Sequence, residues 1–468
     1  MSAYNDRIFM NISTLPEEYQ AAFKDADIRG HYPYEIDETV AYRVGRALVA
    51  LMKAKTVVVA RDMRISSPSI SDALIQGIRD GGGTVQDIGL VPTTALYYAS
   101  GTWQSWGVMV TASHNPPDYS GLKIVRPGAI PLTKVSGLKE IQQYVKKFSS
   151  EEKVAGQRGK KQTRKILRSY IKAMEREVPL TSTKPLKIVA DAGNGMASMM
   201  LSELSKSSAY KIDILNKTLD GTFPARASNP MLRKNQGPIR QALKSGSYDL
   251  GISFDGDGDR VAFFLPNGKM LNGAVVGAMF AEQLLVDQPE ATFVDTVFNS
   301  RIYHEVVRKA GGKVKKARVG HSFIKEMMRK HDAIFACEHS GHYYFKANFY
   351  TDSSLLALRY MVRAIAAGGG GVEETVRPYQ KYHQTEEILV KVADKQAVLK
   401  KVAQQYQKQA GTKIHKFDGV TVDRGDVWFT VKQSVTEDAL KFLVEAPKRA
   451  QARATQKEIH QFLKDNST

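Results

Sequence analysis

Short apolar runs alternate with amphipathic stretches along most of the chain. Several of these runs end in turn-forming or charged residues, and the segments, with those residues included, lie at 56–62, 106–113, 186–195, 248–260, 292–297 and 332–342. A helix-like pattern follows the first of them, over 69–81. Short apolar runs separated by helices are typical of parallel α/β units. The polar residues of interest follow the carboxyl ends of these predicted strands, the edge at which open α/β sheets bind ligands.

Two segments indicate domain boundaries in a chain of 468 residues, which is too long for a single hydrophobic core. A basic stretch near 150–168 separates a first domain from a second, and AAGGGGVEE at 366–374 is flexible by composition. Beyond it the pattern changes to strands with one helix around 395–409. This order predicts a small α+β domain at the carboxyl end.

The net charge of +19 predicts an anionic partner. A phosphorylated small molecule, nucleic acid and an anionic membrane surface all fit that sign. The densest basic stretch, 153–172, has no aromatic residue before Tyr170 and makes a poor platform for single-stranded nucleic acid. We interpret it as a solvated linker and helix face. No apolar run reaches the roughly 18 residues needed to span a bilayer, so we expect no membrane segment.

Cysteine usage and the first residues bear on location. Cys337 is the single cysteine, which excludes an internal disulfide and fits a reducing compartment. The first residues, MSAYNDRIFMNIS, lack the basic and apolar regions of a signal peptide. We therefore expect a cytoplasmic protein.

The segment VTASHNPPDYSGLK, residues 110–123, ends a predicted strand at Ser113. His114 lies beside this serine and Lys123 follows ten residues later. Such a serine is a nucleophile or a phosphate carrier, or it belongs to an ordinary turn, which Ser, Asn and Pro favour. The segment alone leaves both interpretations open.

The segment DGDGDR, residues 255–260, alternates aspartates with glycines. In an extended loop Asp255, Asp257 and Asp259 point the same way, and their carboxylates repel unless a cation neutralises them. Oxygen ligands select Mg²⁺ or Ca²⁺. An EF-hand is excluded, because Arg260 and Pro266 stand where that loop needs Gly and Glu. The alternative is a solvated acidic loop, although Arg260 favours phosphate nearby.

Two further segments carry weaker signals. In CEHSGH, residues 337–342, Glu338 and Ser340 suit sugar hydroxyls and His342 suits a hydrogen bond or proton transfer, although a buried polar network fits equally. In VKQSVTEDALK, residues 431–441, hydroxyls and backbone amides can surround an anion. Its candidate residues are Lys432, Ser434, Thr436 and Lys441. The alternative there is a surface turn that enters a capped helix.

Together and in this order, the segments resemble the α-D-phosphohexomutase superfamily, and within it the bacterial phosphomannomutase/phosphoglucomutase group. The resemblance covers nearly the whole chain and rests on DIRG (27–30), TASHNP (111–116), DGDGDR, VGHS (319–322) and CEHSGH. It implies three similar α/β domains with mixed sheets and a C-terminal α+β domain, in a heart shape around a central cleft. The expected domains are 1–160 with the phosphoserine loop, 161–267 with the metal loop, 268–372 with the sugar loop and 373–468 with the phosphate loop.

The resemblance also implies a role for each motif position. Ser113 would carry the phosphoryl group, and its phosphate oxygen would bind Mg²⁺ together with Asp255, Asp257 and Asp259. The residues lining the phosphoryl-transfer site would be Arg29, His114, Lys123 and Arg260. The residues contacting the substrate would be Glu338, Ser340, His321, His342, Lys432, Ser434, Thr436 and Lys441.

The implied reaction interconverts hexose 6-phosphate and hexose 1-phosphate, with mannose or glucose as the sugar. It would proceed through the phosphoserine and a hexose 1,6-bisphosphate, which also serves as activator. The expected partner is a phosphorylated hexose, with no nucleic acid or membrane, and the expected assembly is a monomer or dimer. The alternatives are a phosphoglucosamine mutase and, in another class, a non-catalytic sugar-phosphate-binding paralogue.

The chain departs from the family pattern in three places. Ala26 stands where relatives usually have tyrosine, and Val297 stands where a lysine is common. The phosphate loop reads K-Q-S-V-T-E-D in place of R-P-S-N-T-E-P. Lys432 keeps the charge but loses the bidentate fork of arginine, so we expect a weaker phosphate grip or a shifted substrate preference. Every group that the transfer itself requires is retained, which favours an active enzyme.

Overall fold

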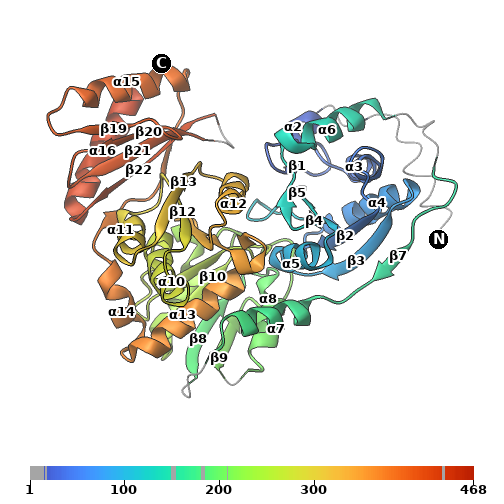
Figure 1. Cartoon of the computed structure of the whole chain (residues 1–468), viewed down its shortest axis with the longest axis horizontal. Helices are drawn as coiled ribbons and strands as arrows, with labels where there is room; N and C mark the ends of the chain where they lie inside the picture. The colour runs from blue at the N-terminus through green and yellow to red at the C-terminus, as the bar shows by residue number, and fades with distance from the viewer. Residues whose placement is uncertain are drawn as a thin grey trace. The chain divides into compact units, whose positions relative to one another are not determined.

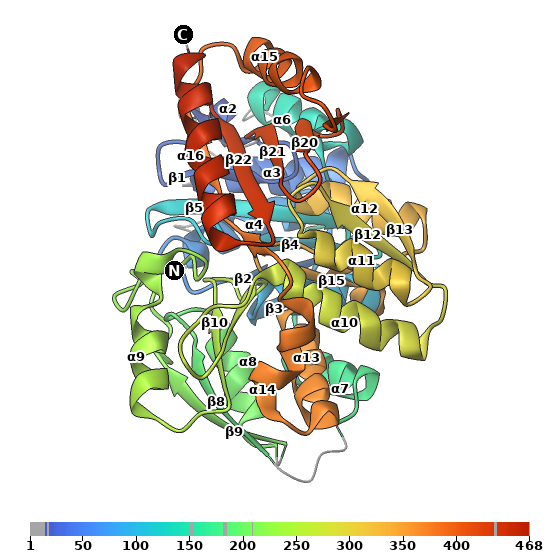
Figure 2. The ribbon, with the colours of Figure 1, turned by 90° about the vertical axis from the view of Figure 1, so that its left-hand side faces the viewer.

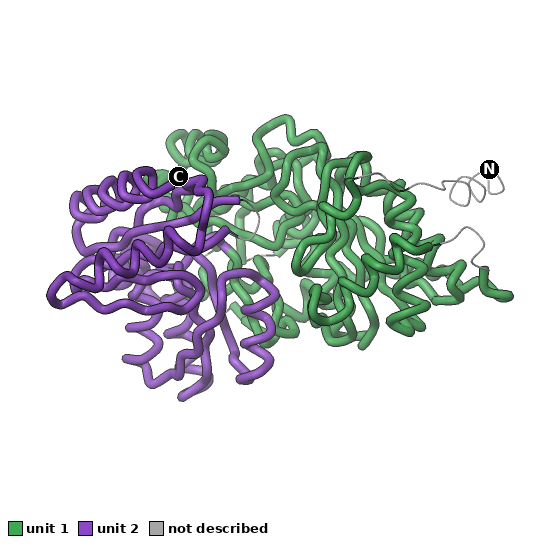
Figure 3. Tube along the Cα trace, turned by 90° about the horizontal axis from the view of Figure 1, so that it is seen from above, with its two compact units in different colours: residues 1–271, 342–366 green, residues 272–341, 367–468 purple. Residues whose placement is uncertain are grey.

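The computed structural model describes residues 15, 18–148, 154–180, 185–207, 209–434 and 438–467. These residues form two compact units (Figure 3). Unit 1 comprises the described residues up to Leu271 together with 342–366, and unit 2 comprises 272–341 and the described residues from 367 onward. Within the described part of the chain, no helix combines the length and the apolar character that crossing a bilayer requires.

A seven-stranded mixed sheet forms the first half of unit 1 (Figure 1). Its path runs β1-β5-β4-β2-β3-β7, and β6 pairs with β5. The strands are β1 (Ile28–His31), β2 (Thr56–Arg61), β3 (Thr84–Leu90), β4 (Trp106–Val110), β5 (Tyr119–Arg126), β6 (Ile130–Pro131) and β7 (Lys161–Thr163). β2 lies parallel to β3 and β4, whereas β5 runs antiparallel to β4 and β1.

In the described part of the chain, the helices that accompany this sheet are α2 (Tyr19–Ala22), α3 (Glu38–Ala50), α4 (Ser67–Asp80), α5 (Thr93–Trp103) and α6 (Leu138–Lys147). Helix α4 matches the helix predicted over 69–81. Helices α3 and α4 approach closely because Gly77 has no side chain; a Cβ there would lie 2.0 Å from the carbonyl oxygen of Tyr42. Val57, Val59 and Leu74 belong to the fully buried core beneath the helices.

A four-stranded sheet, ordered β11-β10-β8-β9, forms the second half of unit 1. Its strands are β8 (Leu186–Asp191), β9 (Tyr210–Leu215), β10 (Leu250–Phe254) and β11 (Val261–Phe264), with helices α7 (Leu167–Glu177), α8 (Ala197–Leu204) and α9 (Gly237–Ser245). β8 is parallel to β9 and β10, and β11 is antiparallel to β10. Unit 1 also contains the antiparallel pair β15 (Tyr343–Phe345) and β16 (Thr351–Asp352), after which α13 (Ser354–Gly368) begins.

Unit 2 begins with a parallel α/β segment. β12 (Thr292–Thr296) pairs in parallel with β13 (Lys313–Ala317) and with β14 (Phe335–Cys337). The accompanying helices are α10 (Gly273–Asp287), α11 (Arg301–Lys309) and α12 (His321–Lys330), and the short α14 (Gly371–Val376) follows later. The apolar run predicted over 332–342 forms a strand only as far as Cys337, because the polar residues beyond it form a turn.

An antiparallel sheet, ordered β17-β22-β21-β20-β19 with β18 beside β22, completes unit 2 (Figure 2). Its strands are β17 (His383–Gln384), β18 (Ile388–Val390), β19 (Lys413–His415), β20 (Val420–Asp423), β21 (Trp428–Gln433) and β22 (Leu440–Ala446). Helices α15 (Lys395–Gln407) and α16 (Arg449–Asp465) pack on one face, where Phe429, Val431 and Phe442 are buried. This arrangement confirms the predicted C-terminal α+β domain and its helix near 395–409.

The four-domain division with its exact boundaries stays a prediction. Strand β7 concerns the boundary predicted between the first two domains. It begins at Lys161, just past the predicted end of the first domain at 160, yet it pairs with β3 of the first sheet. The mixed α/β class expected from the sequence is confirmed.

Candidate active site

Ser113 occupies a constrained turn just beyond the end of β4. Its φ of +51° lies in the left-handed region, which costs a residue other than glycine about 1–3 kcal/mol. The Ser113 backbone amide donates to Oγ1 of Thr111 at 2.9 Å, and the side chain is almost entirely buried. An unusual conformation at a buried serine distinguishes this turn from an ordinary surface turn.

The three aspartates of DGDGDR converge as the sequence predicts. Asp255 follows β10, Asp259 precedes β11, and the three residues offer carboxylate oxygens within 4.8 Å of one another. Burial, followed by the charges of Asp259 and Asp257, raises the pKa of Asp255 well above its usual value. Oδ1 of Asp257 is buried and accepts no hydrogen bond within the described residues. The donor set is hard and anionic, so it fits a divalent metal ion.

Lys123 reaches this cluster from β5. Its Nζ donates to Oδ2 of Asp257 at 2.8 Å and to Oδ2 of Asp259 at 2.7 Å. Burial alone would lower the pKa of Lys123, but the two carboxylates outweigh burial and raise the pKa well above its usual value. The lysine is therefore charged at any physiological pH and compensates part of the carboxylate charge.

The Ser113 hydroxyl lies at the edge of the acidic cluster. Its Oγ donates to Oδ2 of Asp255 at 3.3 Å and lies 3.4 Å from Nδ1 of His114. Arg260 donates from Nη2 to the same His114 nitrogen at 2.9 Å. Burial, then Arg260 and Arg29, lowers the pKa of His114 well below its usual value, so the imidazole is neutral.

Arg29 comes from β1, which pairs with the strand that carries Lys123. Its Nη1 donates to Oδ1 of Asn115 at 3.0 Å, and its other terminal nitrogen pairs with Asp27. Arg29, His114, Lys123 and Arg260 thus surround Ser113 and the aspartates, all within unit 1. The role that the resemblance gives each of them stays a prediction.

His342 also lies in unit 1, although it was predicted as a substrate contact. Its Nδ1 is 3.9 Å from Oδ1 of Asp259 and 3.8 Å from Oδ2 of Asp352, and its ring stacks on Tyr344. The imidazole therefore borders the acidic cluster. Asp352 carried no signal in the sequence.

The remaining predicted contacts lie in unit 2. Glu338 and Ser340 follow β14, and His321 opens α12. Lys432 and Lys441 are direct cross-strand partners in β21 and β22. Ser434 is buried at the end of β21, whereas Thr436 lies outside the described residues. The alternative of a capped helix after this loop is wrong, because the chain continues as β22.

The two opposed lysines each have a carboxylate partner. Nζ of Lys432 lies 2.6 Å from Oδ2 of Asp418, and Nζ of Lys441 lies 2.9 Å from Oε1 of Glu387. Like charges directly opposite each other across a sheet destabilise it, and these two ion pairs offset the repulsion. Neither acidic residue belonged to a recognisable motif, so sequence reasoning missed them.

Val297, one of the departures from the family pattern, is buried in unit 2. It packs with Phe298, Trp428 and Leu443 in a small apolar cluster between the β12 loop and the C-terminal sheet. The position thus contributes to packing, which explains why an apolar residue is accommodated there.

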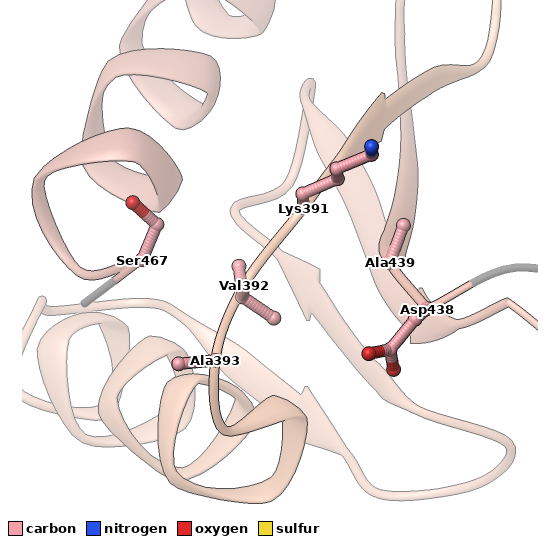
Figure 4. A pocket seen from close by; sticks show the side chains of 6 residues that line it. All are labelled: Lys391, Val392, Ala393, Asp438, Ala439 and Ser467. Carbon is pink, nitrogen blue, oxygen red and sulfur yellow. The ribbon is translucent and has the colours of Figure 1, made fainter.

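A pocket of about 600 Å³ at the edge of the C-terminal sheet contains none of these residues (Figure 4). Its lining consists of Lys391, Val392, Ala393, Asp438, Ala439 and Ser467. This lining brings together no cluster of nucleophilic or metal-ligating groups, so the candidate chemistry rests with the residues above.

Comparison with known proteins identifies the family. Three domain models of phosphoglucomutase/phosphomannomutase match the chain in order: α/β/α domain I over residues 20–152, domain II over 168–268 and domain III over 272–382. A phosphohexose mutase of Xanthomonas campestris pv. campestris is 34% identical, with 92% of this chain and 95% of the relative covered. The phosphomannomutase of Escherichia coli K12 is 32% identical, with 91% and 94% covered.

A solved structure agrees with these relatives. The crystal structure of a phosphoglucomutase/phosphomannomutase family protein from Burkholderia thailandensis superimposes with a TM-score of 0.84 at 29% identity. The match covers 96% of this chain and 98% of that one. The chain therefore belongs to the phosphoglucomutase/phosphomannomutase family of the α-D-phosphohexomutase superfamily and is an intramolecular phosphotransferase.

Proposed function

We propose that this phosphotransferase interconverts hexose 6-phosphate and hexose 1-phosphate, with mannose, glucose or both as the sugar. The observation that carries the proposal is the position of Ser113, whose Oγ lies 3.3 Å from Asp255 within a buried cluster of three carboxylates. The names of the relatives in Xanthomonas and Escherichia support the substrate class. The retained serine, aspartates and cations argue against a non-catalytic paralogue.

Ser113 carries the transferred group in this proposal. The phosphorylated serine gives its phosphoryl group to the free hydroxyl of the bound hexose phosphate: the bond from phosphorus to the serine oxygen breaks, and a bond to the sugar oxygen forms. The sugar hydroxyl gives up its proton, and the serine oxygen regains one. The product is a hexose 1,6-bisphosphate. It reorients so that its other phosphate faces Ser113, and it returns that phosphoryl group to the serine.

The metal proposed for the acidic cluster is Mg²⁺. Asp255, Asp257 and Asp259 would hold it together with the phosphate oxygen on Ser113, and it would neutralise charge on the transferred group. Oδ1 of Asp257, which is buried and accepts no hydrogen bond from any residue that the structure describes, supports this assignment.

The cationic side chains supply the remaining neutralisation. Phosphoryl transfer depends on in-line placement and on compensation of the charged oxygens more than on covalent help from the protein. Lys123, Arg29 and Arg260 carry fixed positive charge around Ser113. The neutral His114 adds no charge, and its Nδ1 accepts from Arg260 at 2.9 Å.

We assign recognition of the rest of the substrate to unit 2. Glu338 and Ser340 would hold sugar hydroxyls, and His321 would contact the sugar or its phosphate. Lys432, Ser434 and Lys441 would anchor the phosphate that does not react, and Thr436 would join them. The cross-strand placement of Lys432 and Lys441 supports an anion site, because two ammonium groups share one face of the sheet.

The direct test is turnover, followed by ³¹P NMR, with mannose 1-phosphate and with glucose 1-phosphate as substrates. Each reaction contains Mg²⁺ and a catalytic amount of glucose 1,6-bisphosphate. We expect the 6-phosphate to form, and we expect the product to disappear with EDTA or with Ser113→Ala. Equal turnover by Ser113→Ala would contradict the proposal. Exclusive turnover of glucosamine 1-phosphate would reassign the sugar.

A further inference from the structure

One buried hydroxyl joins the backbone of Ser113 to the backbone of the aspartate loop. Oγ of Ser228 donates to the carbonyl oxygen of Ser113 at 3.1 Å and accepts from the amide of Gly256 at 3.0 Å. Ser228 is 2% exposed. Gly256 lies between Asp255 and Asp257, so the hydroxyl connects the serine proposed to carry the phosphoryl group with the loop proposed to hold the metal.

The space around this contact is closed. A Cβ on Gly256 would lie 2.7 Å from Oγ of Ser228 and 2.9 Å from the carbonyl oxygen of Ser113. Glycine at this position therefore lets the two loops approach each other directly. A side chain there would push the Ser113 turn away from the acidic cluster.

Arg64 holds the same carbonyl from the other side. Its Nη2 donates to the carbonyl oxygens of Ser113 at 3.0 Å and of Asn115 at 2.7 Å. The guanidinium is almost fully buried, pairs with Asp62 at 3.3 Å and lies 5.2 Å above the ring of Phe223. Arg64 thus holds the turn through its backbone carbonyls, whereas Ser228 links the carbonyl oxygen of Ser113 to the amide of Gly256 in the aspartate loop.

The segment that delivers Ser228 is itself anchored to the second sheet. Arg226, two residues earlier, pairs with Asp191 at the end of β8 and donates from Nη2 to the carbonyl oxygen of Phe254 at 2.7 Å. Through Arg226, the segment that carries Ser228 is therefore held at the ends of β8 and β10, and the aspartate loop begins at the end of β10.

We propose that Ser228 is a positioning residue for phosphoryl transfer. Its hydroxyl keeps Ser113 in its left-handed conformation at a fixed distance from the aspartates, so that Oγ remains beside Asp255. The proposal rests on the proposed function of Ser113. Transfer needs alignment of the reacting oxygen, and a shift of about 1 Å from a group outside the chemistry can cost about 100-fold in rate.

The test compares Ser228→Ala with Ser100→Ala. Ser100 is a fully buried serine of the same unit, and its Oγ donates to the carbonyl oxygen of Ser105 at 2.7 Å. Each purified protein is mixed with glucose 1,6-bisphosphate and Mg²⁺, and phosphate incorporation at Ser113 is followed by rapid quench and intact mass. Thermal unfolding and the kcat and KM for hexose 1-phosphate are measured in parallel.

For Ser228→Ala we expect the phosphorylation rate and kcat to fall about 10- to 100-fold with KM little changed, because alignment is lost while substrate binding is kept. Ser100→Ala should lose comparable thermal stability and keep the wild-type rate. Ser228→Cys, which retains a weak donor, should fall between wild type and Ser228→Ala.

The outcomes separate the two proposals. Absence of phosphate on wild-type Ser113 would overturn the proposed function. If wild type is phosphorylated and Ser228→Ala reacts at the same rate, or loses no more than Ser100→Ala, the positioning role is wrong. Should Ser228→Ala not fold, the Ser228→Cys rate decides: a wild-type rate overturns the positioning role, and an intermediate rate upholds it.

Discussion

The ammonium group of Lys123 lies 2.8 Å from Oδ2 of Asp257, so a single buried lysine compensates a proposed magnesium ligand. Removal of this lysine leaves the buried carboxylates without their closest cation. Breaking a buried ion pair by removing one partner costs about 3–5 kcal/mol. Lys123→Met should therefore lower the free energy of unfolding of the metal-free protein by that order.

The same variant tests metal binding independently of activity. In the wild type, Lys123 already compensates Asp257 and Asp259, whereas in Lys123→Met this charge is missing and Mg²⁺ replaces it. The rise in Tm on adding Mg²⁺ should therefore be larger in Lys123→Met than in the wild type. Thermal unfolding with EDTA and with Mg²⁺ measures both values. Lys139→Met, which changes an exposed lysine on α6, serves as control. An identical Mg²⁺ shift in Lys123→Met and wild type would count against a metal at the three aspartates.

The apolar cluster around Val297 predicts a penalty for restoring the residue common in the family. Val297→Lys would place an ammonium group among Phe298, Trp428 and Leu443, and an unsatisfied buried polar group costs about 1–3 kcal/mol. Chemical denaturation should show this loss, whereas Val286→Lys, at a valine 78% exposed, should be nearly neutral. Equal effects at the two sites would mean that the cluster does not contribute to stability.

Lys432 should control affinity for the substrate. Lys432→Ala removes a cation from the proposed phosphate anchor, and hydrogen bonds to charged groups contribute about 1.5–3 kcal/mol, or roughly 10- to 100-fold. We expect KM for hexose phosphate to rise by that factor in steady-state kinetics. Lys391→Ala, at an exposed lysine of the same domain, should leave KM unchanged. A normal KM for Lys432→Ala would move the anchor elsewhere.

Glu387 predicts a pH dependence of stability. Burial alone would raise its pKa, but His339 and Lys441 outweigh burial and lower the pKa to about 2. A depressed carboxyl pKa contributes stability above the unfolded value of about 4.5, and the contribution is lost as pH falls towards about 2. Glu387→Gln should therefore lower Tm at pH 7, with the difference from wild type shrinking below about pH 4.5.

The neighbouring Glu386 provides the control for this pH dependence. Glu386 is exposed, so Glu386→Gln should change Tm little at any pH within that range. A difference between Glu387→Gln and wild type that stays constant from pH 7 to pH 3 would show that the contacts of Glu387 with His339 and Lys441 do not supply the pH-dependent stability.

The sequence predicted those parts of the candidate site whose chemistry follows directly from the residue types. Three alternating aspartates after an apolar run indicated a cation cluster, and a serine at a strand end indicated a candidate carrier. Both lie just beyond the ends of parallel strands, and the apolar periodicity alone predicted where those strands end. The approach of Ser113 to Asp255 from a different sheet, at 3.3 Å, was implied by the family resemblance, and no local pattern encodes it.

There is a physical reason why the supporting residues could not be predicted from the sequence. Arg64 and Ser228 act on backbone carbonyl and amide groups, which every residue possesses, so their partners leave no signature in the sequence. Asp418 and Glu387 acquire their roles only when distant strands bring Lys432 and Lys441 beside them. In the sequence, Val297 was only a departure from the family pattern. Its packing role could not be predicted, because its partner Trp428 lies more than a hundred residues away in the chain.

The most direct test of the central claim is the intact mass of the purified protein, with peptide mapping, before and after incubation with glucose 1,6-bisphosphate and Mg²⁺. We predict an added phosphate of about 80 Da on Ser113 that is lost when mannose 1-phosphate or glucose 1-phosphate is supplied. A protein that never carries phosphate on Ser113, or that carries it without transferring it to either sugar phosphate, would contradict the claim.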